Sequence, residues 1–495
     1  MSQVDGGCVC DAGDWFRPEL GRIILEELQE PPRFHRKQWE FAVIYRALEA
    51  AGLLDGTREG ISFGSGTERL LYALARRVKH LWATDLYAED SAWDIARTER
   101  PLAFLEAHAP FPIPPGSVSA RAMDMRTIAF PPASFDFAYS SCAIEHIGHR
   151  ADFVRHLKEV RRVLRPGGVY AFTTELTWQR EAVALEGNYY FSRALLEDVV
   201  RESGLACAAT FDATLSPHAI NTPLPIELSG GRNDGEGRFN ERLFGLLSHL
   251  QLCTANVPFT SCLVVLRKEQ TPFEGFTWRG WEESQRQVEA GLGQVRALVE
   301  EAELELQPFA WLPDRRSRQY LGHAAFFARE PAPPPDRVPG AMLHTAYVWL
   351  GARPRELRVS LGLLAPEGAR VHLTVHRSPA ARPDVIEVEQ ERWLPVVGGA
   401  LEAGVALTPR DGCTYAVLAS IDEPAARLTR ARVTASPAGA EPLVPLAAAS
   451  PPGPAVEAGG PPLLGTAVET LSLAARALPR VALSRLRRLR AGRPA

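Results

Sequence analysis

A glycine loop and an acid lie at a spacing that suits a nucleoside. The loop Gly64 to Gly66 follows a short apolar run, Ile61 to Phe63, and Asp85 closes the next apolar run, His80 to Thr84. Glycine permits a tight turn and a close approach of backbone to ligand, and a carboxylate at the end of the second strand can accept both hydroxyl protons of a ribose. The spacing predicts a nucleoside-binding βαβ unit.

The elements that position these residues follow from the surrounding pattern. Helices are predicted over Glu68 to Val78, Val154 to Leu164 and Tyr189 to Ser203. The second of these ends at Arg165-Pro166-Gly167-Gly168, and a strand Val169 to Thr174 follows it. A dinucleotide site prefers a third glycine where this loop has Arg69, because that glycine lets the helix pack on the strand. The loop therefore favours a nucleoside without a pyrophosphate.

Four motifs together resemble the class I S-adenosylmethionine-dependent methyltransferases. They are the loop GSGTE, the acid after the second strand, Met123-Asp124-Met125 before a loop, and the strand Ser134 to Ser141. Their order and spacing imply an α/β, Rossmann-like seven-strand domain over residues 32–269. The resemblance implies S-adenosylmethionine as the cofactor.

The resemblance also implies which residues bind the cofactor. The glycines line its methionine part, the acid at 124 bonds the adenine amino group, and the end of the fourth strand forms the floor of the methyl-transfer site. A cation on the helix before the fold could bind the methionine carboxylate, and Glu68 could bond the methionine amine. The expected cofactor-binding residues are Gly64, Ser65, Gly66, Glu68, Asp85, Leu86, Asp124, Met125, Ser141 and Arg36.

The sequence departs from the family at two positions. Ser62 stands where these enzymes usually carry an acid, and Glu68 replaces the usual last glycine. The segments RKQWEF, FGSGTE, ATDL and SSCAIEHIG resemble a bacterial subgroup associated with surface-polysaccharide and glycosylation gene clusters. A decayed domain that binds no cofactor is the alternative that these departures leave open.

Glu145 and His146 are the candidate catalytic residues, because the family places groups that face the methyl just past the fourth strand. An imidazole titrates near neutrality and suits a general base, and Glu145 could orient it or hold a substrate hydroxyl. The structural alternative is that Glu145 hydrogen-bonds the loop and His146 packs in a polar core. Lys37, Gln38, Tyr189, Tyr190 and His218 are weaker candidates near the pocket.

Composition narrows the class of protein. The 495 residues are 46% hydrophobic with a net charge of -4, which predicts two or three globular domains and argues against a nucleic-acid partner. The seven cysteines are scattered and odd in number, which favours a reducing compartment. Cys8 and Cys10 are interpreted as part of a mobile tail, and no metal site is predicted. We expect a cytoplasmic protein.

The rest of the chain is predicted to form a second domain and linkers. Residues 1–31 are expected to form a tail and helix, 270–330 a helical connector around an amphipathic helix Trp281 to Leu306, and 331–339 a proline-rich linker. Short apolar runs predict a β-sandwich over 340–435. Residues 436–462 are expected to be disordered, and 463–495 to form a basic amphipathic helix that could contact an anionic membrane or remain a surface tail.

Three functions remain open on the sequence. The favoured hypothesis is a methyltransferase that O-methylates a sugar or glycan-linked acceptor, with the sandwich binding the acceptor chain or a partner. The second is a quinone or lipid methyltransferase at the inner face of the membrane. The third is a scaffold without catalysis. Cofactor binding separates both enzymes from the scaffold.

Overall fold

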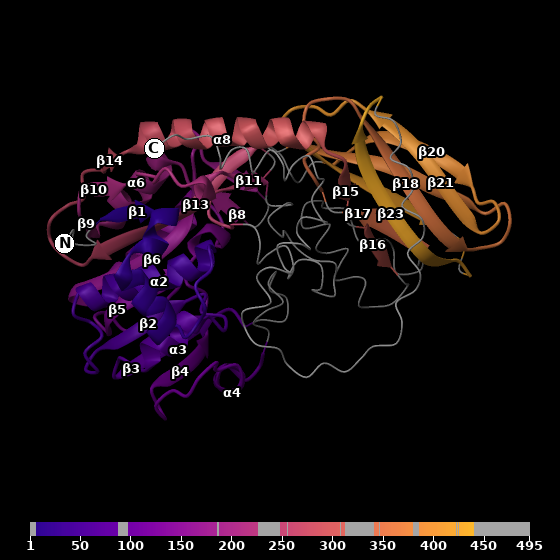
Figure 1. Cartoon of the computed structure of the whole chain (residues 1–495). Helices are drawn as coiled ribbons and strands as arrows, with labels where there is room; N and C mark the ends of the chain where they lie inside the picture. The colour runs from indigo at the N-terminus through magenta and orange to yellow at the C-terminus, as the bar shows by residue number, and fades with distance from the viewer. Residues whose placement is uncertain are drawn as a thin grey trace, which may run out of the picture. The chain divides into compact units, whose positions relative to one another are not determined.

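The computed structural model describes residues 6–87, 98–185, 188–225, 248–254, 256–306, 308–311, 341–345, 347–379, 386–421, 423 and 425–439. These residues form two compact units, the first extending to Leu292 and the second beginning at Gly293. Figure 1 shows the elements of both. Among the described residues no helix is long and apolar enough to cross a membrane.

The first unit is built on a 12-stranded mixed sheet in which β4-β3-β2-β5-β6-β13-β1-β10-β14 are neighbours in that order. The strands are β1 (Gly7–Val9), β2 (Glu59–Phe63), β3 (His80–Asp85), β4 (Val118–Ala122), β5 (Phe135–Ser141), β6 (Leu164–Thr177), β9 (Ala206–Cys207), β10 (Thr210–Asp212), β11 (Leu224–Pro225), β12 (Leu252–Thr254), β13 (Val257–Arg267) and β14 (Thr277–Arg279). Strands β4, β3, β2, β5 and β6 are parallel, and β13 is antiparallel to β6. A hairpin of β7 (Val183–Leu185) and β8 (Asn188–Tyr190) stands apart.

Helices cover both faces of this sheet. They are α1 (Pro18–Arg22), the π-turn η2 (Ile23–Glu27), α2 (Arg36–Ala50), α3 (Arg69–Ala75), α4 (Pro101–Ala107), α5 (Arg150–Val163) and α6 (Arg193–Ser203), with short 3-10 turns η1 (Ala12–Phe16), η4 (Ile144–His146) and η5 (Ala219–Asn221). Alternate β6 residues enter the two cores: Tyr170 joins the α5 and α6 side, and Ala171 joins the α2 and α3 side. The result is a three-layer α/β/α domain, as the sequence predicted.

The N-terminal segment is part of this sheet, so the prediction of a mobile tail containing Cys8 and Cys10 was wrong. Strand β1 lies between β13 and β10, with Cys8 opposite Leu263 on one side and Asp212 on the other. Cys10 is fully buried, and burial raises the pKa of its thiol. Asp11 then fixes the following turn by accepting hydrogen bonds from Ser216 and Asn221. Three apolar residues were too short a pattern to identify as a strand.

The first-unit predictions also need three smaller corrections. The sheet has more than the seven predicted strands because β1, β11, β12 and β14 join it. The helix predicted over Tyr189 to Ser203 begins only at Arg193, where Ser192 caps it, and Tyr189 lies in β8. The helix predicted to extend from Glu68 to Val78 is shorter, Arg69–Ala75.

The second unit is a β-sandwich of two antiparallel sheets, β15-β23-β18-β21 and β16-β17-β22-β19-β20. Its strands are β15 (Leu304–Leu306), β16 (Pro308–Trp311), β17 (Ala341–Thr345), β18 (Arg355–Leu364), β19 (Arg370–Pro379), β20 (Glu387–Pro395), β21 (Ala400–Leu407), β22 (Cys413–Ile421) and β23 (Arg427–Pro437). The sandwich begins earlier than predicted, because β15 and β16 lie in the expected connector. The helix α8 (Trp281–Glu301) ends before Leu306 for the same reason.

One buried cation holds the start of the sandwich together. The Arg355 side chain is fully buried and donates to the carbonyls of Val299, Leu350, Ala302 and Ala435. Two of these carbonyls belong to the end of α8 and the residue after it, where the helix dipole favours a positive charge. Burial lowers the pKa of Arg355 to about 10. The predicted linker 331–339, residues 440–462 and the terminal helix 463–495 lie outside the described residues, whereas 436 and 437 end β23.

Candidate functional site

The glycine loop is attached to β3 by hydroxyl groups. Ser65 Oγ donates to the Thr84 carbonyl at 3.0 Å and accepts from Thr84 N at 3.0 Å, and Thr84 Oγ1 donates to the Ser62 carbonyl at 2.6 Å. Ser62 and Ser65 share a short hydrogen bond. Ser62 is completely buried and a carboxylate in its place would need a counter-charge there. The residue that departs from the family pattern thus completes a neutral network.

The loop has room for a ligand at one glycine and none at the other. Gly66 has φ +45° and a Cβ built on it would meet nothing within 4 Å. Gly64 has φ +64°, and its Cβ would lie 2.7 Å from the Cβ of Ala143, which follows β5. Gly64 therefore lets the loop approach the end of β5, and Gly66 keeps the loop open beside it.

Asp85 is placed to receive a ribose. Its Oδ2 accepts from Gly66 N at 2.9 Å and its Oδ1 from Leu86 N at 2.7 Å, so each oxygen keeps a lone pair for a hydroxyl. Burial raises the pKa of Asp85, and the two backbone donors lower it. Leu86 is 49% exposed beside it and offers an apolar surface to a base. These residues fit the nucleoside predicted from the sequence.

The predicted adenine contacts are arranged differently. Asp124 is half-exposed, and Arg126 holds it with a bidentate ion pair whose closest distance is 2.6 Å. Met125 is buried, and its carbonyl contacts His156 Nδ1 at 2.8 Å. Nε2 of that ring lies 2.9 Å from the Tyr170 hydroxyl, and burial lowers the pKa of His156 to about 4. Asp124 must therefore share its carboxylate between Arg126 and any adenine.

Lys37 lies closer to the glycine loop than the predicted Arg36 does. Its Nζ donates to the Ser141 carbonyl at 2.9 Å and pairs with Glu40 at 3.0 Å and with Glu68 at 3.4 Å. Burial disfavours the charged amine, but these carboxylates outweigh it and raise the pKa of Lys37. Burial raises the pKa of Glu68 to about 7, although Lys37 opposes the shift. The Lys37 and Glu68 pair could bind the two charges of an amino acid.

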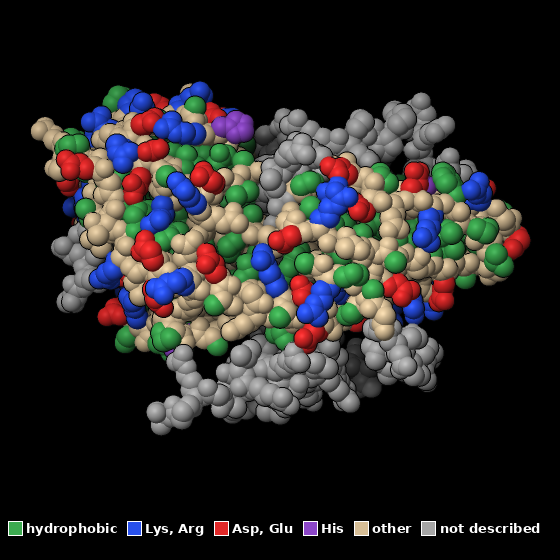
Figure 2. All heavy atoms as spheres, turned by 90° about the horizontal axis from the view of Figure 1, so that it is seen from above, with side chains coloured by type: hydrophobic (Ala, Val, Ile, Leu, Met, Phe, Trp, Pro, Cys, Tyr) green, Lys and Arg blue, Asp and Glu red, His purple; other side chains and the backbone are tan. Residues whose placement is uncertain are grey.

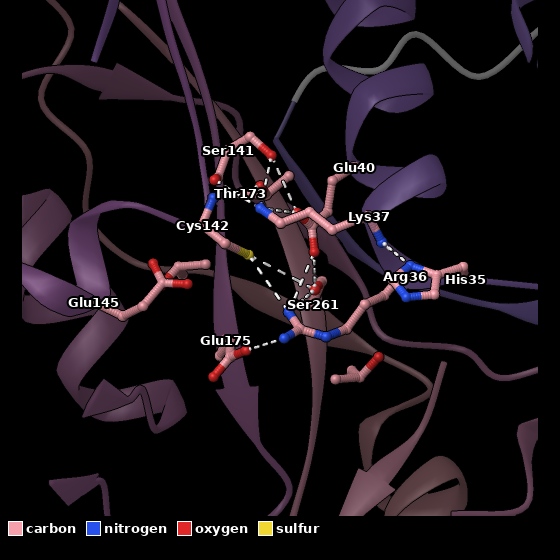
Figure 3. A network of polar contacts seen from close by, with 12 residues as sticks. His35, Arg36, Lys37, Glu40, Ser141, Cys142, Glu145, Thr173, Glu175 and Ser261 are labelled. Carbon is pink, nitrogen blue, oxygen red and sulfur yellow. Dashed lines mark hydrogen bonds and ion pairs between the residues drawn. The ribbon is translucent and has the colours of Figure 1, made fainter. Parts of the chain in front are cut away.

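Arg36 is held by protein carboxylates. Its guanidinium pairs with Glu40 at 3.3 Å and, more closely, with Glu175, and it donates to Ser261 Oγ at 3.1 Å. Ser261 in turn donates to Glu40 at 2.5 Å. Figure 3 shows Arg36, Lys37 and Glu40 of α2 next to Ser141 at the end of β5, Glu175 of β6 and Ser261 of β13. The structure thus gives Arg36 a different set of partners from the cofactor carboxylate that the resemblance implied.

Glu145 is buried in this network, with 1% of its surface exposed. Thr174 Oγ1 donates to its Oε2 at 3.1 Å, and its Oε1 is buried without a hydrogen-bond partner among the described residues. Burial, and then the neighbouring Glu175, raise the pKa of Glu145 to about 8. His146 follows it on η4, half-buried, with its backbone N–H donated to Ala143 at 3.2 Å. Ala143, which directly precedes η4, is the residue that lies against Gly64, so the turn carrying Glu145 and His146 starts at the glycine loop.

The site contains more acid than base. Four carboxylates lie in one connected group with only two cations: Glu40, Glu68, Glu145 and Glu175 with Arg36 and Lys37. Glu40 and Glu175 were not predicted. A carboxylate four residues after an arginine on a helix was the available signal for Glu40. Glu175 ends an apolar strand, and only the fold brings it to Arg36.

The weaker candidates have structural contacts. Gln38 is buried and donates to Glu30 and the Pro31 carbonyl, which fixes the turn before α2. Tyr190 is buried against Phe259, and His218 stacks on Phe16. No group of three or more His, Cys, Asp or Glu side chains suited to a metal occurs in the described part of the chain.

Comparison with known proteins gives the class of this site. A family model described as a methyltransferase domain matches residues 61–172, which span β2 to β6. An S-adenosylmethionine-dependent methyltransferase from Mesorhizobium loti shares 17% identity over 45% of this chain and 96% of its own, with a TM-score of 0.28. One from Aquifex aeolicus shares 14% identity over 33% and 79%, with a TM-score of 0.24. Among curated proteins none matches the sequence.

The fold and the loop define a nucleoside-binding α/β domain, and the family match narrows that class. Residues 61–172 of the first unit match the methyltransferase domain, and S-adenosylmethionine is the cofactor that this match supports. The acceptor is not indicated by any comparison.

Proposed function

We propose that this protein transfers a methyl group to a hydroxyl of a sugar or a glycan-linked acceptor. The single observation that carries the proposal is the Glu145 carboxylate, buried beside the glycine loop with Oε1 unpartnered among the described residues. A hydroxyl is a poor nucleophile until it loses its proton, so it needs a base within hydrogen-bond reach. Glu145, with a pKa raised to about 8, is matched to that task near neutrality.

The chemistry supplied by the bound cofactor is an activated methyl group on a sulfonium. The chain's own task is to bind and orient both molecules and to exclude water. Asp85 and Leu86 would hold the nucleoside, and Lys37 with Glu68 the amino-acid end. Glu145, with His146 beside it, would take the proton of the acceptor. The alternative base is His146, with Glu145 orienting the hydroxyl.

The charge of the site supports a neutral acceptor group. Both cations are already paired, Arg36 with Glu175 and Lys37 with Glu68. A phosphate or carboxylate at the reacting position would lie near the buried carboxyl groups of Glu145 and Glu175, which disfavour a further negative charge. A sugar hydroxyl meets no such repulsion. Figure 2 shows acidic and basic side chains interspersed over one face of the described surface, and we propose no nucleic-acid partner.

The first experiment is calorimetric titration of S-adenosylhomocysteine into the full-length protein and into Asp85→Ala. We expect micromolar binding that the substitution weakens by at least tenfold, since it removes the ribose acceptor. Radiolabelled methyl transfer to a panel of nucleotide sugars and oligosaccharides follows, with Glu145→Gln and His146→Gln compared. Absence of binding at millimolar ligand would refute the enzyme and favour the scaffold. Binding with transfer to lipid or quinone alone would refute the glycan acceptor.

A further inference from the structure

The excess of carboxyl groups in the site affects the binding of a positively charged cofactor. S-adenosylmethionine carries one more positive charge than S-adenosylhomocysteine, because its sulfur is a sulfonium. Glu145 is buried next to a second carboxylate, Glu175, whose own partner Arg36 is shared with Glu40. A buried carboxyl in that position is favoured in its neutral form until a positive charge arrives.

We propose that Glu145 binds a proton in the cofactor-free protein and releases it when S-adenosylmethionine, but not S-adenosylhomocysteine, occupies the site. The inference rests on the proposed function, because it assumes that the cofactor's sulfur lies near η4. The closeness of Gly64 to Ala143, two residues before Glu145, ties the cofactor loop to that turn. Glu145 would then be the residue that distinguishes the charged methyl donor from its neutral product.

The groups that face Glu145 come from four strands and a helix. They are Glu175 and Tyr170 of β6, Cys142 after β5, Cys262 of β13, Tyr190 of β8, and Arg36 and Lys37 of α2. Burial raises the pKa of both thiols and both phenols, so these four groups stay neutral across the range in which Glu145 titrates. Arg36 and Lys37 stay charged, and among these groups Glu145 is the one whose protonation can follow the sulfonium.

Loss of the proton makes Glu145 a base for methyl transfer, and its negative charge balances the positive charge of the sulfonium. With the methyl donor bound, Glu145 is a carboxylate and can accept the proton of an acceptor hydroxyl. As the oxygen–carbon bond forms and the carbon–sulfur bond breaks, the sulfonium charge disappears and the proton moves to Glu145. The sum of the two charges is zero before and after transfer. The base is therefore active only when a methyl group is present to be transferred.

The test is calorimetric proton release by the full-length protein at pH 7. Each ligand is titrated in two buffers with different ionisation enthalpies, phosphate and Tris, so that the difference in apparent enthalpy counts protons. We expect S-adenosylmethionine to release about one proton more than S-adenosylhomocysteine. Below pH 8, the affinity for S-adenosylmethionine relative to that for S-adenosylhomocysteine should increase about tenfold for each unit by which the pH is raised. Any proton lost from Glu68 is common to both ligands and cancels.

Two variants complete the test. In Glu145→Gln the extra proton should vanish while both ligands still bind, and in Glu68→Gln it should persist. Equal proton release for the two ligands in the wild-type protein would overturn the inference, as would an extra proton that survives Glu145→Gln. If Glu145→Gln fails to fold, the wild-type difference still decides. Failure of both ligands to bind would instead refute the proposed function.

Discussion

At the scale of residues, the sequence and the structure differ most in which cation is available to the amino-acid end of the cofactor. The sequence showed two adjacent cations at the start of a helix, and nothing in their spacing says which one faces the glycine loop. The fold decides it, because Glu175 and Ser261 bind Arg36 and leave Lys37 at Glu68 and the end of β5. Which of the two cations faces the glycine loop therefore depends on residues that lie far away in the sequence.

We expect Lys37→Met to weaken S-adenosylhomocysteine binding by roughly tenfold, because it removes the cation for the ligand's carboxylate. Binding of 5′-methylthioadenosine, which lacks the amino-acid end, should be unchanged. Isothermal titration of both ligands gives the comparison, and Arg36→Met is the matched control. An equal loss for both ligands in Lys37→Met would show a structural effect of the helix rather than a contact with the carboxylate.

Glu145 should also make the protein less stable as pH rises. Its pKa is about 8 in the folded protein and lower when unfolded, so between those values the folded state binds more protons. The stabilisation is complete below the unfolded pKa and is lost as pH rises through the folded one. We therefore expect Glu145→Gln to raise the melting temperature at pH 8.5 relative to wild type and to change it little at pH 5. Thermal scans at the two pH values test this, and an equal change at both would contradict it.

At the scale of elements, the sequence predicted the parallel half of the sheet and missed its far edge. The glycine loop follows β2, Asp85 ends β3, and the Arg-Pro-Gly-Gly run lies at the start of β6, so residues with specific backbone or ligand requirements identify these strands. Strand β1 contains no residue of this kind. Its residues Gly-Cys-Val pair with both neighbouring strands through backbone groups, which any sequence can supply. In the sandwich, small and charged residues interrupt the apolar alternation of β21 and β23, so these two strands lack a clear signal in the sequence.

The pairing of β1 predicts a strong effect from a small substitution. A Cβ at Gly7 would lie 2.3 Å from the Phe211 ring and 2.9 Å from the Leu263 carbonyl, so both neighbouring strands would have to move. We expect Gly7→Ala to lower the free energy of unfolding of the first unit by about 2 kcal/mol. Gly21→Ala is the control, because its Cβ would meet nothing within 4 Å, and it should be neutral or stabilising. Urea unfolding measures both, and equal midpoints would argue against the observed pairing.

At the scale of the whole molecule, the chain separates into two units with their own cores, and the glycine loop and Asp85 belong to the first. A ligand that binds only the native form of one unit stabilises that unit by mass action. We therefore expect two calorimetric transitions, with S-adenosylhomocysteine raising the midpoint of only one. A shift of both transitions would show that the units unfold together.

The other transition can be assigned with Arg355. Methionine at this position would leave four carbonyls without their buried donor, which we expect to cost roughly 3 kcal/mol in the second unit. The control is Arg358→Met, whose side chain is 52% exposed and pairs only with Glu356 among the described residues. Differential scanning calorimetry should show the cofactor-insensitive transition lowered by Arg355→Met alone. A lowering of the cofactor-sensitive transition would contradict the assignment.

The place of β1 in the sheet also sets an order of events during synthesis. Residues 7–9 leave the ribosome about 255 residues before their partners in β13, which are residues 262–264. At ordinary translation rates of about 5–20 residues per second, the strand waits on the order of 10–50 seconds for them. During that wait the strand lacks one of its two neighbours in the sheet, and β10 alone can pair with it. The sheet can be completed around β1 only after residue 264 has emerged.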